Sequence, residues 1–141
     1  MSRIYWDTML FIYWVEDHPI HGERVKEIYD RMRRRRDVLC ASAFSVAEAL
    51  TGPLKRGEAE TAANIRSFFD SPIVEVSLFT RETAERYAQI RASLRVSQPD
   101  AIHLACAAQS GTDLFLTNDH HLQGLVVPGI DFIAGMDTDI L

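Results

Sequence analysis

Apolar and polar positions change their period repeatedly along this chain, and these changes predict strands and helices in turn. Short apolar runs typical of buried strands occupy residues 3–6, 38–41, 73–76, 114–116 and 130–133. Apolar residues recur at helical spacing over residues 9–15, 25–32, 46–50, 62–69, 80–94 and 99–110. The third of these helices is expected to end near Gly52-Pro53. Strands that alternate with helices predict an α/β fold, with a central, mainly parallel sheet and helices on both faces.

The composition is that of an ordinary folded domain. Hydrophobic residues make up 47% and charged residues 25% of the 141 positions, so the chain can bury a core. We expect one compact domain over residues 1–141, in which residues 133–141 form a loosely ordered tail. The formal net charge of -5 does not indicate a nucleic-acid-binding domain, which is usually basic. One dense basic cluster, Arg31 with Arg33–Arg36, is either a solvated helix end or a phosphate contact.

Three features bear on the compartment. Cys40 and Cys106 stand far apart in apolar contexts, which favours buried free thiols in a reducing compartment over a metal motif. The apolar run Met9–Val15 is no signal peptide, because acidic residues flank it and no small-residue cleavage site follows. The run is also too short to cross a membrane. We therefore expect a cytoplasmic protein with no membrane partner.

Four carboxylates each interrupt or directly end an apolar run, namely Asp7, Glu48, Asp100 and Asp119. A carboxylate beside apolar surface is costly unless its charge is compensated. Asp7 and Asp119 fall where predicted strands end, and the other two fall in or near the first turns of predicted helices. Ligands of such sheets bind outside the carboxyl ends of the strands, so the four groups can converge on one divalent cation. Ligation by oxygen alone favours Mg²⁺ or Mn²⁺ over zinc.

Each acid also has a purely structural interpretation. Asp7 can cap the helix that follows it, and Asp100 can complement the dipole of its own helix. Glu48 completes a capping-box pattern that begins at Ser45. Asp119 ends a run of three residues that are all good helix caps. The sequence leaves capping and metal ligation open at each of these positions.

The histidines do not suggest a zinc site, because no spacing resembles a zinc motif. His120 and His121 are adjacent, so on a helix their side chains would point about 100° apart and would rarely share one ion. His103 follows Asp100 by three residues and can approach the same site. We interpret His103 as a partly buried structural histidine.

Four segments carry a resemblance to a known family. In chain order they are Tyr5–Thr8, Glu48, Pro99–Ala105 and Leu116–Asp119. This ordered set resembles the PIN-domain ribonucleases, and among them the VapC toxins of toxin–antitoxin pairs. The resemblance covers nearly the whole chain and implies a three-layer α/β/α sandwich. One departure is Met9, where the family often has a small polar residue.

The resemblance also implies roles for single residues. Asp7 and Asp100 would be the principal Mg²⁺ ligands, with Glu48 and Asp119 completing the acidic cluster. The hydroxyls of Thr8 and Thr117 match the positions at which the family usually has hydroxyl groups, and Asn118 matches a polar position beside the ligands. The implied metal and catalytic set is therefore Asp7, Glu48, Asp100 and Asp119, joined in catalysis by Thr117.

The implied function is a Mg²⁺-dependent endoribonuclease, with Mn²⁺ as a substitute ion, that acts as the toxin of a toxin–antitoxin pair. The metal would activate a water molecule and stabilise charge on the scissile phosphate of RNA. The resemblance further implies an antitoxin partner and a PIN–PIN homodimer. Alternatives are a PIN-fold nuclease without an antitoxin, an RNA-binding module, and a Mg²⁺-dependent phosphatase or DNA nuclease. The sequence does not separate RNA from DNA as the substrate.

Overall fold

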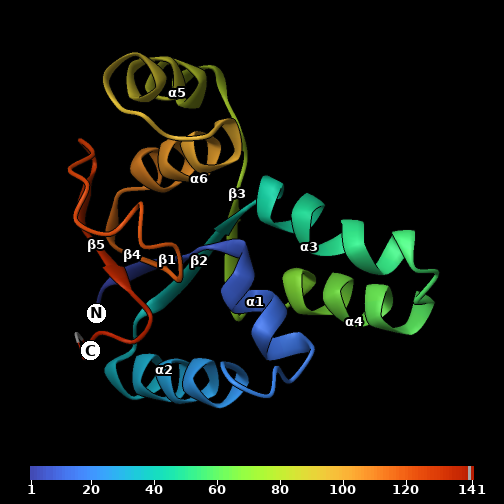
Figure 1. Cartoon of the computed structure of the whole chain (residues 1–141). Helices are drawn as coiled ribbons and strands as arrows, with labels where there is room; N and C mark the ends of the chain where they lie inside the picture. The colour runs from blue at the N-terminus through green and yellow to red at the C-terminus, as the bar shows by residue number, and fades with distance from the viewer. Residues whose placement is uncertain (140) are drawn as a thin grey trace.

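A central sheet lies between two layers of helices in the computed structural model, which describes residues 1–139 and 141 (Figure 1). The strands are β1 (Arg3–Trp6), β2 (Val38–Ser42), β3 (Val74–Ser77), β4 (Thr112–Thr117) and β5 (Ile130–Gly135). They pair in the order β3-β2-β1-β4-β5, and every pairing is parallel. The predicted α/β/α sandwich is therefore confirmed.

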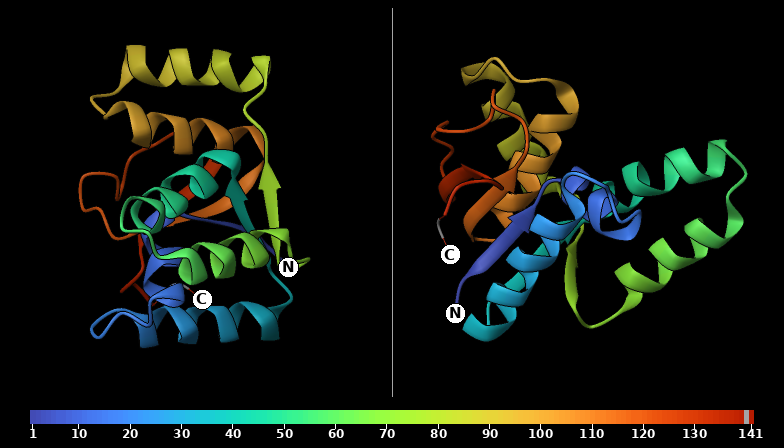
Figure 2. Two further views of the ribbon diagram at one scale, coloured as in Figure 1. Left: turned by 90° about the vertical axis from the view of Figure 1, so that its right-hand side faces the viewer. Right: turned by 60° about the horizontal axis from the view of Figure 1, so that its bottom comes forward.

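The helices divide between the two faces of the sheet. They are α1 (Thr8–Val15), α2 (Gly22–Arg35), α3 (Ala43–Lys55), α4 (Ala59–Asp70), α5 (Arg81–Ser93) and α6 (Gln98–Gln109). The first four supply one hydrophobic cluster and the last two supply the other. The pair α3 and α4 extends away from the sheet as an arm (Figure 2). Within the described residues, no helix combines the length and the apolar character needed to cross a bilayer.

The middle strand β1 shows how one short apolar run serves both layers. Successive side chains of a strand point to opposite faces of the sheet. Ile4 and Trp6 accordingly belong to the cluster with α1–α4, whereas Tyr5 belongs to the cluster with α5 and α6. All three side chains are 0% exposed, as expected for a central strand of a parallel sheet that is covered on both sides. Asp7 therefore follows a strand that is buried on both faces.

Helix α3 is longer than expected at both ends. It begins at Ala43 with Ser42 as its N-cap, and Ser42 and Ser45 form a reciprocal capping box. It continues through Pro53, so the expected end near Gly52-Pro53 is wrong. Proline inside a helix costs one backbone hydrogen bond. Pro53 is buried and lines a groove together with residues of α1 and α4.

The C-terminal segment also differs from the expectation of a loosely ordered tail over 133–141. The last residues of β5 pair with β4, with Thr117 opposite Gly135, and the next residue, Met136, is 1% exposed. The guanidinium group of Arg24 donates to the carbonyl of Met136 at 2.9 Å. The expected loose tail is wrong for residues 133–136, because strand pairing and burial hold them in place. Ile140, which the expectation also covered, lies outside the described residues.

The cap of α3 predicts a stability effect. Replacing Ser42 by Ala is expected to lower the free energy of unfolding by about 1–2 kcal/mol, because α3 loses its N-cap. The change also removes the acceptor of the buried Tyr5 hydroxyl, which lies 2.8 Å from the Ser42 oxygen. Urea denaturation followed by circular dichroism measures the loss. Ser93→Ala, at the exposed end of α5, is the control and should change stability by less than about 0.5 kcal/mol. Equal effects would contradict the capping role.

Candidate active site

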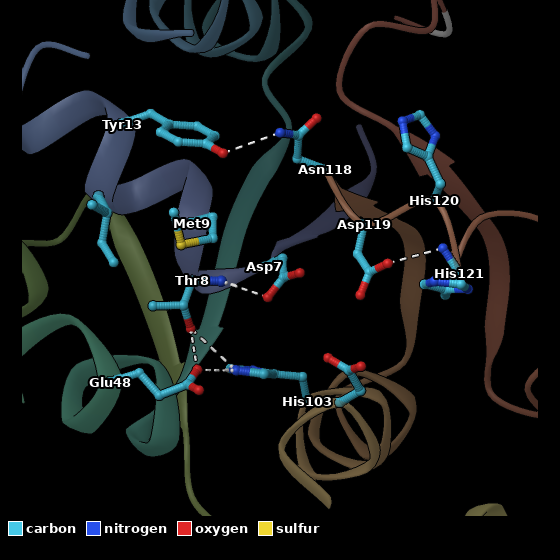
Figure 3. A pocket seen from close by; sticks show the side chains of 12 residues that line it. Asp7, Thr8, Met9, Tyr13, Glu48, His103, Asn118, Asp119, His120 and His121 are labelled. Carbon is cyan, nitrogen blue, oxygen red and sulfur yellow. Dashed lines mark hydrogen bonds and ion pairs between the residues drawn. The ribbon is translucent and has the colours of Figure 1, made fainter. Parts of the chain in front are cut away.

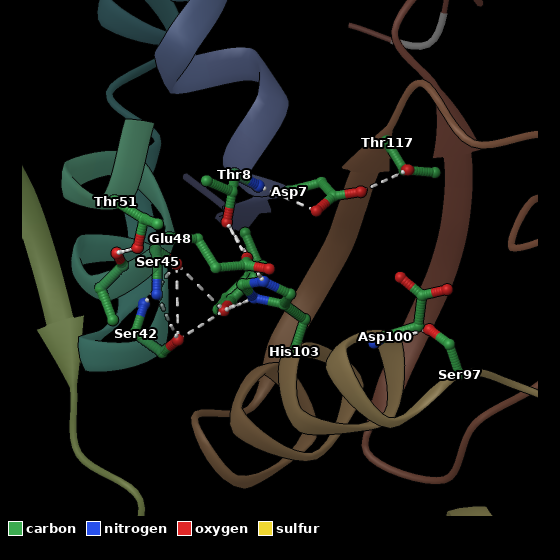
Figure 4. A network of polar contacts seen from close by, with 12 residues as sticks. Asp7, Thr8, Ser42, Ser45, Glu48, Thr51, Ser97, Asp100, His103 and Thr117 are labelled. Carbon is green, nitrogen blue, oxygen red and sulfur yellow. Dashed lines mark hydrogen bonds and ion pairs between the residues drawn. The ribbon is translucent and has the colours of Figure 1, made fainter. Parts of the chain in front are cut away.

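An acidic cavity of about 660 Å³ lies at the carboxyl edge of the sheet. All four predicted carboxylates line it: Asp7 after β1, Glu48 on α3, Asp100 on α6 and Asp119 after β4 (Figures 3 and 4). Parallel strands bring their carboxyl ends to the same edge, which explains how residues up to 112 positions apart in sequence share one cavity. The predicted convergence of the four acids on one edge of the sheet is thus what the structure shows.

Asp7 combines capping with a place in the cavity. Its Oδ1 accepts a hydrogen bond from the backbone N–H of Thr8 at 2.8 Å, which makes Asp7 the N-cap of α1. Its Oδ2 accepts from the Thr117 hydroxyl at 2.8 Å, and its backbone N–H donates to Leu116 at 2.9 Å. Capping therefore does not exclude a place at a metal site, because the Asp7 carboxylate both caps α1 and lines the cavity.

The turn after β4 is organised by a buried hydroxyl. Thr117 is 0% exposed, and its oxygen accepts the backbone N–H of Asp119 at 3.0 Å while its proton goes to Asp7. Asp119 in turn accepts the backbone N–H of His121 through Oδ1 at 2.9 Å. The Thr117 hydroxyl therefore sets the relative positions of the two acids that follow β1 and β4.

Two neighbouring positions named in the sequence analysis also face this cavity. Asn118 lines it and donates from Nδ2 to the Tyr13 hydroxyl at 3.0 Å, which ties the turn after β4 to α1. Met9, the departure from the family pattern, lines the cavity too and is 42% exposed. The cavity consequently has an apolar side chain at its rim next to Asp7 (Figure 3).

Glu48 does not occupy the capping position that its sequence pattern suggested. The capping box belongs to Ser42 and Ser45, so Glu48 lies in the second turn of α3. Its Oε1 accepts from the Thr8 hydroxyl at 2.6 Å and from His103 Nε2 at 2.5 Å. Burial acts to raise the pKa of Glu48, but the hydrogen bonds from His103 and Thr8 outweigh it and hold that pKa below its ordinary value. Glu48 is therefore a carboxylate at neutral pH.

The pKa of Asp100 is raised, whereas that of Glu48 is lowered. Asp100 lies in the first turn of α6, whose N-cap is Ser97, as the sequence predicted for a first-turn acid. Burial has the largest effect and raises the pKa of Asp100; the hydrogen bond from Ser97 opposes it, the negative charges of Asp7 and Asp119 raise the pKa further, and His103 lowers it slightly. The charges of Asp7 and Asp119 thus repel the ionised form of Asp100 across the cavity. A cation placed among them would relieve that repulsion.

The sequence placed His103 near Asp100 but did not predict its contacts. It is 2% exposed rather than partly buried and lies between α6 and Glu48 (Figure 4). Its Nδ1 lies 2.7 Å from the Tyr5 hydroxyl. Its Nε2 contacts Glu48 and lies 3.1 Å from the Thr8 hydroxyl. The available signal was its spacing of three residues from Asp100, which puts both on neighbouring positions of one helix face.

The donor set fits a hard divalent cation, although the structure does not present a closed cage. Among residues 1–139 and 141, no three His, Cys, Asp or Glu side chains stand close enough together to hold a metal ion. The arrangement therefore differs from a site in which all four carboxylates bind one ion directly. Mg²⁺ usually keeps several waters and uses only one or two carboxylates, so the oxygen-rich cavity suits a hydrated ion.

The arginine cluster lies away from the cavity. Arg33–Arg36 end α2, immediately before β2, and Val38 pairs with Arg3 at the start of β1. Asp7 follows the other end of β1, so the length of the strand separates the cluster from the acids. Part of the cluster is also neutralised locally, because Arg35 pairs with Asp37 at 2.8 Å. These arginines therefore do not contact a phosphate that is bound at the carboxylates.

The low pKa of Glu48 predicts a pH dependence of stability in metal-free buffer. A carboxyl group whose pKa is lower in the folded state stabilises the fold above its unfolded pKa. The free energy of unfolding of the wild type should therefore exceed that of Glu48→Gln at pH 7, and the difference should shrink as pH falls below the ordinary value of 4.5. Denaturation in buffer that contains EDTA, at pH 7 and at pH 3, measures the free energies of unfolding of the wild type and of Glu48→Gln. A difference that does not depend on pH would contradict this assignment.

Two features define the structural class of this protein. One is the α/β/α sandwich, and the other is the set of carboxylates around one cavity at the carboxyl edge of its parallel sheet. The PIN domain family matches residues 4–126, which is most of the chain. The protein belongs to the PIN domain family, as its resemblance predicted. The search of curated proteins found no match.

Solved structures with the same fold include components of toxin–antitoxin systems. A chain of VapBC2 from Rickettsia felis, bound to a promoter DNA fragment, superposes with a TM-score of 0.75 at 14% identity, covering 94% of this chain and 98% of that one. A toxin–antitoxin complex from Klebsiella pneumoniae gives 0.69 at 18% identity, covering 90% and 94%. The sarcin-ricin loop cleaving toxin VapC20 from Mycobacterium tuberculosis gives 0.64 at 18%, covering 79% and 86%. Identities this low show the fold alone.

Proposed function

We propose that this protein is a Mg²⁺-dependent endoribonuclease and the toxin of a toxin–antitoxin pair. The observation that carries the proposal is the meeting of four carboxylates, from two strand ends and two helices, around one cavity. Asp7 and Asp119 are close enough to Asp100 for their charges to act on it. Family membership adds support, as does the likeness of fold to a toxin described as cleaving the sarcin-ricin loop.

In this proposal Asp7 and Asp100 are the principal ligands of the ion. A bound Mg²⁺ supplies Lewis-acid stabilisation of the charge that develops on the scissile phosphate. Thr117 holds the Asp7 carboxylate in place through its hydroxyl. The hydrogen bonds of Glu48 described above all fall on Oε1, and that of Asp119 falls on Oδ1. Each of these two acids thus keeps its second oxygen to orient the attacking water.

A direct assay tests the activity and separates it from its rivals. Labelled RNA and DNA of the same sequence are each incubated with the protein in Mg²⁺, in Mn²⁺ and in EDTA. The proposal expects internal cleavage of RNA with either metal, with 5′-phosphate ends, and none in EDTA. Cleavage of DNA alone would favour a DNA nuclease, and RNA binding without cleavage would favour a binding module; either result contradicts the proposal.

The antitoxin proposal rests on the surroundings of the cavity. A groove of about 210 Å³ runs between α1, α3 and α4 and is lined largely by apolar side chains, among them Phe11, Val15 and Phe69. Ile12 and Glu48 line both the groove and the acidic cavity, so the two lie side by side. A partner segment with apolar side chains for the groove and a cationic side chain for the carboxylates would fit both. Two of the similar structures contain toxin–antitoxin pairs.

Co-expression tests this partner. The protein is produced with the small product of the neighbouring gene, and the pair is purified through a tag on one member. We expect a stable complex that suppresses cleavage, and recovery of the tagged protein alone would contradict the antitoxin proposal. The mass of the free protein in solution tests the proposed PIN–PIN homodimer, for which a monomeric mass would be the contrary result.

A further inference from the structure

A buried histidine lines the wall of the acidic cavity, and the proposed reaction gives it no role. His103 is 2% exposed, yet both of its ring nitrogens have polar partners. Nδ1 lies 2.7 Å from the Tyr5 hydroxyl on β1, and Nε2 reaches Glu48 on α3. The ring thus connects α6, which carries Asp100, to the helix that carries Glu48.

Two donors meet on a single oxygen of Glu48. The Thr8 hydroxyl donates to Oε1 at 2.6 Å, and His103 Nε2 lies 2.5 Å from the same atom. The Tyr5 hydroxyl, which contacts the other ring nitrogen, also bonds Ser42, the N-cap of α3, at 2.8 Å and so belongs to the buried packing of α3 against the sheet. A glutamate with three rotatable bonds is thereby restricted to one position at the cavity wall.

We propose that His103 is a positioning residue that acts through Glu48: its Nε2–H holds Oε1, which leaves Oε2 available to the cavity. This role rests on the proposed function, because the position of Glu48 matters to a divalent cation and its water. A histidine that served only to pack α6 against the sheet would need the contact to Tyr5 and not the contact to Glu48. The two contacts use different nitrogens, so they can be separated by substitution.

Replacing His103 by each of the two amide residues separates its contact to Glu48 from its contact to Tyr5. In His103→Gln the amide nitrogen replaces Nε2 and keeps a donor toward Glu48, whereas in His103→Asn it replaces Nδ1 and keeps only the side facing Tyr5. The probe is Mn²⁺ alone, titrated into the protein and followed by electron paramagnetic resonance. We expect His103→Asn to weaken Mn²⁺ binding by about 10–100-fold and His103→Gln to restore it to within about threefold of the wild type.

Tyr5→Phe is the matched control. It removes the hydroxyl that bonds His103 Nδ1 but leaves Nε2 and Glu48 untouched, so we expect lower stability with Mn²⁺ affinity unchanged. A purely structural role predicts instead that affinity follows thermal stability across all three variants, and that result would overturn the inference. A Mn²⁺ affinity of His103→Asn equal to that of the wild type would also overturn the inference.

Nuclear magnetic resonance of the histidine ring in the wild type gives a readout that needs neither metal nor activity. The inference requires a proton on Nε2, whose nitrogen signal should shift in Glu48→Gln. An unprotonated Nε2 would overturn it, and this spectrum decides the question if His103→Asn does not fold. A wild type that binds no Mn²⁺ would overturn the proposed function as well, whereas a wild type that binds Mn²⁺ alongside unaffected variants would overturn only the role of His103.

Discussion

Replacing Asp100 by Asn should abolish most metal-dependent RNA cleavage while leaving the fold intact. The expected loss of rate is about 1000-fold, because a metal's stabilisation of transition-state charge is worth several kcal/mol. The stability of the metal-free protein, unlike the cleavage rate, should not fall in Asp100→Asn. Burial and the charges of Asp7 and Asp119 raise the pKa of Asp100, so its ionised form strains the metal-free protein. In EDTA at pH 7 the melting temperature of Asp100→Asn should therefore be equal to or above that of the wild type.

Adding Mg²⁺ separates this explanation from a general loss of structure. A ligand that binds only the folded state raises its melting temperature. Mg²⁺ should therefore raise the melting temperature of the wild type and have little effect on Asp100→Asn. Asp131→Asn, which removes an exposed acid at the start of β5, is the control and should behave as the wild type. Full RNA cleavage by Asp100→Asn would contradict the assignment of Asp100 as a principal ligand of the metal ion.

The second large effect concerns the hydroxyl of Thr117. In Thr117→Val the side chain keeps its shape, but Asp7 loses a donor at 2.8 Å and the backbone N–H of Asp119 loses its acceptor at 3.0 Å. The position is 0% exposed, so water does not replace the lost partner. We expect the free energy of unfolding to fall by about 1–3 kcal/mol. RNA cleavage should fall by about 10–100-fold, because both acids lose the group that positions them.

Thr117→Ser is the matched variant, because it keeps the hydroxyl and removes only a methyl group. It should recover most of the cleavage rate that Thr117→Val loses, although the cavity left by the methyl group will cost some stability. Single-turnover cleavage and urea denaturation of the two variants measure the two effects separately. Cleavage that is equally impaired in both variants would show that packing, rather than the hydrogen bonds, is what Thr117 contributes.

The sequence was sufficient for the architecture because the signals that define it are local. Each of the strands has an apolar run of its own, and the alternation with helices leaves few topologies. The helix predicted from apolar spacing over residues 99–110 is α6, and its apolar residues Ala101, Leu104, Ala105 and Ala108 are all buried. The convergence of the acids followed from the topology, since a parallel sheet has one carboxyl edge.

The interactions of Glu48 could not be predicted from local patterns. Ser45 and Glu48 satisfy the capping-box spacing, but Ser42 and Ser45 satisfy a reciprocal box three residues earlier, and packing decides between them. Ser45 is 0% exposed because it lies against Tyr5, 40 positions away. The link between His103 and Tyr5 spans 98 positions. Contacts of this range have no signature in neighbouring residues.

The extent of the C-terminal order was missed for a similar reason. The final apolar run was expected to end at Ile133, yet β5 continues to Gly135 because it pairs in register with β4. Gly135 has no side chain, and a Cβ there would lie 2.8 Å from the side chain of Gln123. Glycine therefore permits a close approach at this point of the strand, whereas in the sequence it reads as the end of the strand.

The proposed metal site can be tested with crystals of the wild-type protein grown with Mn²⁺, through an anomalous difference map. We expect a peak inside the acidic cavity, with oxygen atoms of Asp7 and Asp100 nearest to it. Waters would complete the coordination, as the spacing of the carboxylates requires. An empty cavity at saturating Mn²⁺, with the carboxylates bonded only to their neighbouring amides and hydroxyls, would contradict the proposed site.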